Sequence, residues 1–455
     1  MADPIKASEK GMELIEKARK AKQWNKTESD WIKQSLTSRS TLNRFWSRES
    51  IEAANFKAIC NAVGANWFEV AEWANESDDS DVNSLDIINT NEIRWVGRQA
   101  LITELVAKLQ ADCRVLSLVG ITGIGKTSLA ARLCVDTAIR QTLPVLKVIS
   151  FDQQLPNFES VVKCLLGEAI ATDPEMQKQP DKMVMLAVGA LRSRPCLLVL
   201  DRAEVLIKTT PDGIHQFTEP AFQEFLDQVI KADQMPSRIV LTSQYRIPEL
   251  AEGRYLSRRE SISITGLAEV EALELFQVWD IYFEEAEKIL LQRIIQVYEG
   301  HPLAMRVIAG DIKSFGDVQA YWAEYGQEIE EVENIQNLPE IKNKGDRPRL
   351  DRYSLSLEDL VMRRVESTFN RLNQTSQLAY LMICMISAYR CAVEKSACLI
   401  MIEDICTSEQ AKLAFLTLQR RFLLEEKKFN SRKLYRLHNI IRRVALEHLE
   451  RLDER

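Results

Sequence analysis

The motif GITGIGKT matches the phosphate-binding pattern G-x-x-x-x-G-K-[ST] at every defined position. Its glycines, Gly120, Gly123 and Gly125, allow backbone N–H groups to surround a phosphate at short range. Lys126 is expected to reach the β- and γ-phosphates of a nucleotide, and Thr127 is expected to ligate Mg²⁺. The pattern therefore predicts a site for a nucleotide and Mg²⁺.

The chain around this motif supplies the context that a phosphate loop requires. The β-rich run 114–119 precedes it, and a helix is predicted to begin near Lys126. The N-terminus of that helix directs a partial positive charge at the phosphates. We assign Ser128, in the first turn, to the nucleotide-binding residues as well. The alternative is a chance match within an ordinary loop.

A second acidic position is needed for a nucleotide site of this kind. Four consecutive apolar residues lead into Asp201, which is expected at the carboxyl end of a strand, where open α/β sheets bind ligands. Asp201 would hold Mg²⁺, and a helix N-cap is its alternative. Arg202 follows where many such enzymes have a second carboxylate, so Glu204 is the candidate for orienting water. A solvated helix residue is the alternative for Glu204, and we expect at most a weak ATPase.

The elements that position these residues alternate between β-rich runs and helices. Besides the run ahead of the motif, such runs occupy residues 145–151, 196–200, 238–242 and 261–264. Most are apolar on both faces, as buried parallel strands are. This alternation predicts a doubly wound parallel sheet in a P-loop α/β domain.

After residue 267 the pattern becomes helical. Helices are predicted up to residue 340 and again from residue 356. A short β pair near the end, 422–425 with 434–437, suggests a winged helix. The fold class is therefore multidomain, with one α/β domain and several all-α regions.

Composition limits the classes of protein that remain. The chain has 455 residues, 46% hydrophobic and 27% charged, with a net charge of −7, which fits a globular protein of several domains. The start lacks a secretory signal pattern, and the longest apolar run, 378–389, is too short for the ~20 residues of a membrane helix. We therefore expect a cytoplasmic location and no membrane contact. The nine cysteines fit a reducing compartment, and Cys384, Cys391, Cys398 and Cys406 are interpreted as thiols packed in helices.

The first 76 residues are predicted to form short helices over residues 6–23, 27–34, 38–48 and 53–63, with Thr27 as an N-cap. Residues 27–48 have the order helix, turn, helix. The residue types suited to base edges are Arg39, Asn43 and Arg44, and those suited to phosphates are Ser38, Ser40 and Thr41. The segment resembles the lambda-repressor-like helix-turn-helix family, which implies binding of double-stranded DNA. A small helical adaptor that binds protein is the alternative.

Residues 93–450 resemble the NB-ARC/STAND branch of signal-transducing ATPases. Val96, Gly97 and Arg98 resemble the motif that lines the adenine pocket. The segment 237–244 resembles the sensor-1 strand, except that Gln244 replaces the usual Arg, and Arg246 is the nearest substitute for sensing the γ-phosphate.

Two later motifs extend this resemblance. The sequence GHPLA at 300–304 resembles Gly-Leu-Pro-Leu-Ala, in which the proline, here Pro302, packs on the base. The sequence LHN at 437–439 resembles Met-His-Asp, so His438 would contact the ADP phosphates in the inactive state.

The resemblance implies a regulator switched by ATP and ADP, closed with ADP and self-associating with ATP. Family members usually carry a C-terminal repeat sensor, which we expect to be absent from this chain or supplied by another one. Two alternatives remain: a DNA-binding repressor with nucleotide only as a ligand, and an adaptor in bacterial defence or death-type signalling without DNA binding. The predicted divisions are a helix-turn-helix domain 1–76, an acidic linker 77–92, a nucleotide-binding domain 93–267, a helical lid 268–345 and a winged helix 356–455.

Overall fold

The computed structural model describes most of the chain. The described residues are 6–26, 28–65, 70–72, 95–152, 154–210, 215–248, 253–336, 349–429 and 432–453. Thr27 and the linker 77–92 lie outside them. The chain forms two compact units: Met1–Val82 with Asn157–Arg194 and Glu219–Phe225, and Asn83–Pro156 with Pro195–Thr218 and Leu226–Arg455.

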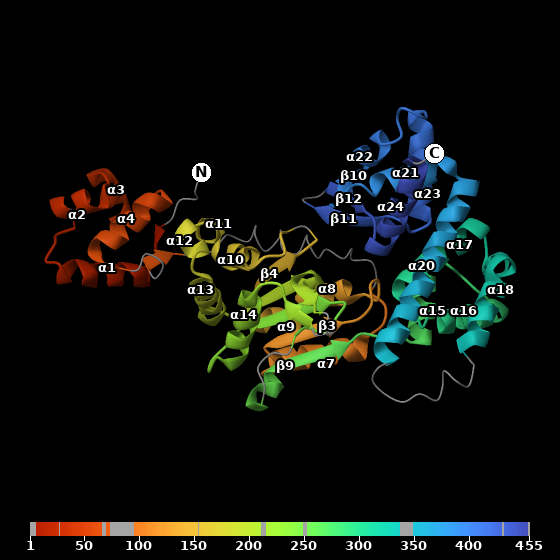
Figure 1. Cartoon of the computed structure of the whole chain (residues 1–455), viewed down its shortest axis with the longest axis horizontal. Coiled ribbons are helices and arrows are strands. Elements are labelled where there is room, and N and C mark those ends of the chain that lie inside the picture. Colours follow the sequence, from red (N-terminus) through yellow and green to blue (C-terminus); the bar gives the residue numbers. More distant parts are fainter. Residues whose placement is uncertain are drawn as a thin grey trace. The chain divides into compact units, whose positions relative to one another are not determined.

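A five-stranded parallel sheet is the centre of the second unit (Figure 1). Its strands, in the order β4-β5-β8-β3-β9, are β4 (Val145–Ser150), β5 (Cys196–Asp201), β8 (Arg238–Ser243), β3 (Val115–Val119) and β9 (Arg259–Ser263). Each coincides with a β-rich run of the sequence to within a few residues, so the predicted parallel α/β sheet is confirmed. Every residue of β3 and β5 is buried, which explains why these strands are apolar on both faces.

The order of the strands places the predicted nucleotide-binding residues at one edge of the sheet. β3 lies between β8 and β9, with Val119 opposite Ser243, and β5 ends at Asp201 opposite Ser150 of β4. Because all five strands are parallel, their carboxyl ends share this edge. The phosphate loop, which follows β3, therefore lies at the same edge as Asp201.

Helices and small β elements make up the rest of the second unit. Before and within the sheet region they are α7 (Gln99–Gln110), α8 (Lys126–Cys134), α9 (Thr137–Thr142), β6 (Ile207–Thr209), β7 (His215–Phe217) and the 3₁₀ turns η1 (Ala203–Leu206) and η2 (Gly253–Arg258). After the sheet they are α15 (Glu269–Val278), α16 (Glu285–Val297), α17 (Pro302–Phe315), α18 (Val318–Gln336), α20 (Arg349–Thr375), α21 (Gln377–Ile386), α22 (Lys395–Ile400), α23 (Ser408–Arg420) and α24 (Asn439–Asp453). No helix within the described ranges has both the length and the apolar character needed to cross a membrane.

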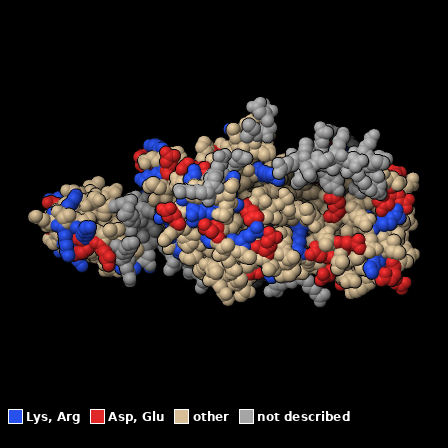
Figure 2. Space-filling model, turned by 90° about the horizontal axis from the view of Figure 1, so that it is seen from below, with Lys and Arg blue, Asp and Glu red and all other residues tan. Residues whose placement is uncertain are grey.

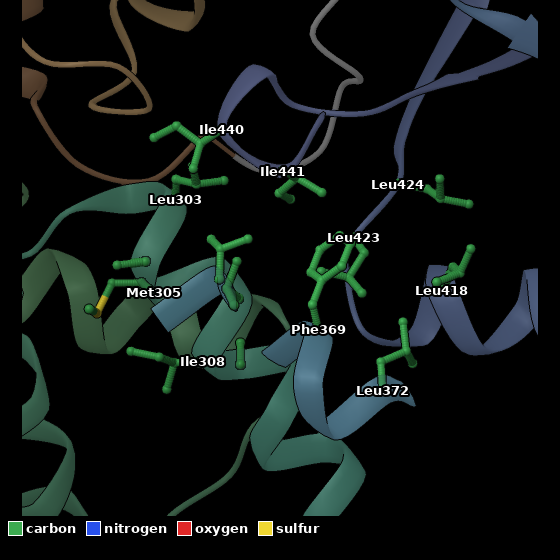
Figure 3. Close-up of a cluster of buried hydrophobic side chains, with 14 of the residues drawn as sticks. Leu303, Met305, Ile308, Phe369, Leu372, Leu418, Leu423, Leu424, Ile440 and Ile441 are labelled. Atoms are coloured by element: carbon green, nitrogen blue, oxygen red, sulfur yellow. The ribbon is translucent and has the colours of Figure 1, made fainter. Parts of the chain in front are cut away.

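One cluster of buried apolar side chains extends from Leu267 to Ala445. It contains residues of α17, α20 and α24, and Figure 3 shows Phe369 of α20 beneath Leu423 and Leu303 beside Ile440. The predicted helical lid and the C-terminal region therefore share one core. α20 begins at Arg349, before the expected boundary at residue 356.

The C-terminal β elements differ from the prediction in position. The hairpin strands are β11 (Glu425–Phe429) and β12 (Arg432–Arg436), and β10 (Val393–Glu394) pairs with β12 as a third strand. The hairpin is present, but its first strand begins three residues later than expected, because Phe422 has a left-handed backbone conformation, φ +54°, just after α23. The cysteine interpretation holds for Cys384 and Cys398, which are buried, but Cys391 is exposed.

The first unit contains two groups of short helices. The N-terminal group is β1 (Lys6–Ala7), α1 (Glu9–Ala21), α2 (Ser29–Ser35), α3 (Arg39–Trp46), α4 (Ala53–Val63) and β2 (Ala71–Glu72), and the other is α10 (Phe158–Leu166), α11 (Glu168–Ala171), α12 (Pro174–Gln177), α13 (Pro180–Ser193) and the start of α14 (Pro220–Lys231). Trp31 is fully buried and donates a hydrogen bond from Nε1 to Ile59 O at 3.0 Å, which ties α2 to α4.

Candidate nucleotide site

The phosphate loop joins β3 to α8 through backbone conformations that favour glycine. Gly123 and Gly125 have φ values of +83° and +97°, in the left-handed region. A Cβ atom at Gly120 would lie 2.9 Å from Ile264 O. The three glycines of the motif are therefore required by the shape of this loop, and α8 begins at Lys126 as expected.

The Lys126 ammonium lies against the loop itself. Nζ donates hydrogen bonds to Gly120 O at 2.7 Å and Ile121 O at 3.0 Å. Burial lowers the pKa of Lys126 to about 8, while the Glu204 and Asp201 carboxylates oppose that shift. Lys126 therefore stays mostly protonated near neutral pH, and its flexible side chain can exchange these carbonyls for phosphate oxygens.

Asp201 is the centre of a hydrogen-bond cluster formed by three other elements. Its Oδ1 accepts bonds from Thr127 Oγ1 and Thr242 Oγ1, both at 2.7 Å, and its Oδ2 accepts one from Ser150 Oγ at 3.3 Å. Asp201 ends β5, and the residue at the N-cap position of η1 is Arg202, so Asp201 is not a helix cap. A carboxylate next to a threonine hydroxyl is a donor set that suits Mg²⁺.

Glu204 lies in η1 with its side chain only 10% exposed, so it is not a solvated helix residue. Its Oε1 lies 3.6 Å from Arg202 Nε and accepts a bond from Gln244 Nε2 at 3.4 Å. Its Oε2 is buried, and no group in the described part of the chain donates to it. One carboxylate oxygen is thus held while the other can accept a hydrogen bond from a ligand or a water.

Arg202 itself is fixed in a left-handed backbone conformation, with φ +63°. Its backbone N–H donates to Thr242 Oγ1 at 2.9 Å, and its guanidinium forms an ion pair with Asp152. Arg246, the suggested γ-phosphate sensor, is exposed and is not brought into this cluster. Gln244, in the segment that resembles the sensor-1 strand, contacts this cluster through its hydrogen bond to Glu204.

The segment Val96–Arg98 lies directly behind the phosphate loop. Arg98 Nη2 donates to Ile124 O and to Thr265 O, both at 2.7 Å, and Arg98 N donates to Glu271 Oε1 at 2.6 Å. Val96 is buried. Burial lowers the pKa of Arg98 to about 10, so the guanidinium remains charged. The predicted adenine-pocket motif therefore also links the phosphate loop to α15.

The N-terminus of α17 contacts the phosphate loop through a residue that sequence reasoning missed. His301 is fully buried, its Nδ1 accepts a bond from Ala304 N at 3.3 Å, and its Nε2 lies 3.0 Å from Thr122 O. An acceptor at Nδ1 makes Nε2 the protonated nitrogen, which donates to the loop carbonyl. Burial lowers the pKa of His301 to about 3, so it is neutral at pH 7. Pro302 is the first residue of α17, beside this contact.

His438 lies immediately before α24, and its Nδ1 accepts a hydrogen bond from Ile440 N at 3.3 Å. Burial lowers its pKa to about 4 against the opposing effect of Glu425, and the guanidiniums of Arg306 and Arg436 add to this lowering. Ile440, two residues later, lies beside Leu303 of α17, the helix whose N-terminus contacts the phosphate loop (Figure 3). Its contact with a nucleotide stays a prediction.

The DNA-binding candidates lie on and before α3. Ser38 Oγ accepts a bond from Thr41 N at 3.0 Å and so caps α3. Arg39, Ser40 and Asn43 are exposed. Arg44 is exposed too, but it pairs with Glu49 Oε2 at 3.1 Å. Figure 2 views the N-terminal helices from the side of α1, where basic and acidic side chains lie next to each other.

A comparison with protein families matches part of this chain. The family described as Novel STAND NTPase 1 matches residues 89–254, which include the phosphate loop, Asp201 and Glu204. This match supports a STAND-type P-loop NTPase.

An uncharacterized WD repeat-containing protein of Nostoc sp. is 26% identical over an alignment of 363 residues that covers 70% of this chain and 28% of that protein. The chain thus spans less than a third of that relative. A STAND protein with a tetratricopeptide repeat sensor from Pyrococcus horikoshii aligns with 78% of this chain and 42% of its own, at 14% identity and a TM-score of 0.45. Cdc6p of Pyrobaculum aerophilum aligns with 82% and 99%, at 14% identity and a TM-score of 0.35. Both scores are too low to support an argument about function.

Proposed function

We propose that this chain is a regulator of the NB-ARC/STAND type, switched by ATP and ADP. The observation that carries the proposal is the cluster at the carboxyl edge of the sheet, where Lys126, Thr127, Asp201 and Glu204 converge from three elements. Lys126 would bind the β- and γ-phosphates, and Ser128 would assist in the first turn of α8.

The hydrolytic role of this cluster would be modest. Thr127 and Asp201 would hold Mg²⁺, which, when bound, neutralises part of the phosphate charge. Glu204 would hold the attacking water at its unpaired Oε2. Because Arg202 lies beside the other oxygen of Glu204, we expect a slow ATPase that serves as a switch rather than a rapid enzyme.

The closed state of the switch would use His438. With Nδ1 accepting from Ile440 N, Nε2 carries the proton and can donate to a phosphate of ADP. Helix α24 and the β11–β12 hairpin would form a winged helix. This winged helix would move away from the phosphate loop when ATP replaces ADP. Such a change requires different affinities of the two conformations for the two nucleotides.

The N-terminal helices would form a helix-turn-helix domain that binds double-stranded DNA through residues 27–48. The exposed Arg39 and Asn43 on α3 favour this function, because these side chains can bind base edges in the major groove. The ion pair of Arg44 with Glu49 favours the alternative, a protein-binding adaptor. A steep fall in DNA affinity with salt would distinguish DNA binding from the adaptor.

The remaining parts of the proposal concern partners. Self-association would occur in the ATP state, in the cytoplasm, and a sensor or effector protein would act in trans. The repeat domain named in the Nostoc relative is consistent with a repeat sensor.

The experiment that tests the site is the nucleotide content of the purified full chain. Denaturation of the wild-type protein should release ADP or ATP, whereas Lys126→Ala should release almost none while remaining folded. Lys182→Ala, an exposed lysine on α13, is the matched control and should retain nucleotide. Equal nucleotide content in Lys126→Ala and the control would overturn the assignment.

A further inference from the structure

Helix α17 contacts two regions that are far apart in the sequence. Its N-terminal end touches the phosphate loop through His301 and Thr122 O. Little more than one turn later, Arg306 Nη1 lies 3.1 Å from Glu425 Oε1, and Arg306 Nη2 donates to Leu424 O at 2.7 Å. One helix therefore connects the phosphate loop to the start of β11.

Glu425 is bound by a second guanidinium as well. Arg436 Nε donates to Glu425 Oε2 at 2.8 Å, and the two residues are opposite each other in the β11–β12 ladder. Burial opposes the ionisation of Glu425, but Arg436 and Arg306 outweigh it and lower the pKa of Glu425 well below its usual range. The carboxylate is thus an ion shared between α17 and the hairpin, and Arg436 stands two residues before His438.

The apolar packing around this cluster joins the same elements. Leu303 of α17 lies beside Ile440 of α24, and Leu423 lies above Phe369 of α20 (Figure 3). Apolar contacts hold surfaces together without fixing their register. The directional part of the interface comes from the charge-assisted hydrogen bonds of Glu425.

We propose that Arg306, Glu425 and Arg436 are positioning residues that keep His438 next to the phosphate loop, and that α17 is the link between the two. This inference rests on the proposed function, in which His438 binds ADP in the closed state. The Glu425 carboxylate compensates two guanidiniums with side chains only 21% and 30% exposed. Without it, those charges repel each other, and the hairpin loses its fixed place on α17.

A second ion pair, between the hairpin strand β12 and its neighbour β10, serves as the control. Arg432 of β12 lies 3.0 Å from Glu394 of β10, but the two side chains are 74% and 51% exposed, and neither belongs to α17. Exposed pairs of this kind contribute little to stability. Glu394→Gln therefore removes one carboxylate charge from the hairpin region without touching the link.

The test is stopped-flow release of fluorescent ADP and ATP analogues from the full chain. Glu425→Gln should release ADP about tenfold faster, the loss expected for one charge-assisted hydrogen bond, and should change ATP release by less than about twofold. Glu394→Gln should behave like the wild type. In a His438→Ala background, Glu425→Gln should cause no further acceleration, because the residue it positions is gone.

The possible outcomes separate this inference from the function on which it rests. If His438→Ala accelerates ADP release but Glu425→Gln does not, the inference is wrong and the closed state stands. If His438→Ala has no effect, the closed state itself fails. Should Glu425→Gln not fold, Arg436→Gln removes one arm of the cluster, and the same selective effect on ADP is expected. Equal acceleration of ADP and ATP by Arg436→Gln would mean a merely structural role.

Discussion

The nucleotide site and the α3 surface differ in how their polar side chains are bound. Asp201 accepts hydrogen bonds from residues 74 and 41 positions away in the sequence, inside a buried cluster. Around α3, Ser38 Oγ accepts a hydrogen bond from Thr41 N three positions later, and Arg44 pairs with Glu49 five positions later. The first arrangement needs the tertiary fold, whereas the second is available to any short surface helix.

This difference determines how much each region says about a ligand. Burying a carboxylate such as Glu204 with one oxygen unpaired is costly unless a ligand or water completes it. Exposed Arg39 and Asn43 lie in water at no such cost. The structure of the buried cluster is therefore itself evidence for a bound ligand. The α3 surface gives no such evidence, so DNA binding there has to be measured.

The largest expected effect is that of Asp201→Asn, which tests the buried nucleotide site. The amide keeps the size of the side chain but removes the charge that Mg²⁺ requires, so Mg²⁺-dependent hydrolysis should fall by on the order of a thousandfold. ATP turnover measured over a Mg²⁺ titration checks this. Turnover within a few-fold of wild type would mean that Asp201 does not hold the metal.

Glu204→Gln should have the next largest effect. Loss of a general base typically costs about a hundredfold or more in rate, while nucleotide binding should be retained because Glu204 does not bind the phosphates in this account. Single-turnover hydrolysis and equilibrium binding on the same preparation separate the two. Loss of binding together with hydrolysis would give Glu204 a structural role instead.

His301→Gln is expected to change how the free energy of unfolding depends on pH. The folded pKa of about 3 lies below the ordinary value of 6.5, so the unfolded chain binds the proton first. Stability should therefore fall as pH decreases through 6.5 and continue to fall until about 3, by up to about 5 kcal/mol from this group at about 1.4 kcal/mol per pH unit. Gln can still donate to Thr122 O but does not titrate.

Urea unfolding of both proteins between pH 7 and pH 4 measures this contribution. The wild type should lose more stability than His301→Gln, since carboxylate effects are common to both and cancel. Parallel curves would contradict the neutral, buried state of His301.

The smallest expected effect concerns the α3 surface. Arg39→Ala should weaken DNA binding by about 1–3 kcal/mol if Arg39 contacts a base. Lys20→Ala on α1, which pairs with Glu16 at the surface, is a control outside residues 27–48. Fluorescence anisotropy with duplexes at low salt gives both values. Absence of any binding, or equal binding by wild type and Arg39→Ala, would favour the adaptor.

The sequence predicted the sheet and much of the site because their signals are local. β5 is apolar on both faces and ends in Asp201, and the phosphate loop carries its own spacing. The first hairpin strand begins later than the apolar run because Phe422 has a left-handed backbone conformation, which a strand does not allow, and Leu423 and Leu424 pack in the core. The contact of His301 with Thr122 O joins residues 179 positions apart, and no local pattern encodes it. The histidine in place of the usual leucine in the GHPLA motif was the available signal.

The most direct test of the account is the dissociation rate of ADP and of ATP from the wild type and from His438→Ala, with the melting temperature of each protein. A hydrogen bond from His438 to an ADP phosphate would be worth about 1.5–3 kcal/mol. A closed state held by this bond predicts ADP release at least about tenfold faster in His438→Ala, with ATP release and melting temperature nearly unchanged. A lower melting temperature with the ratio of ADP to ATP release unchanged would contradict it and make His438 an ordinary packed residue.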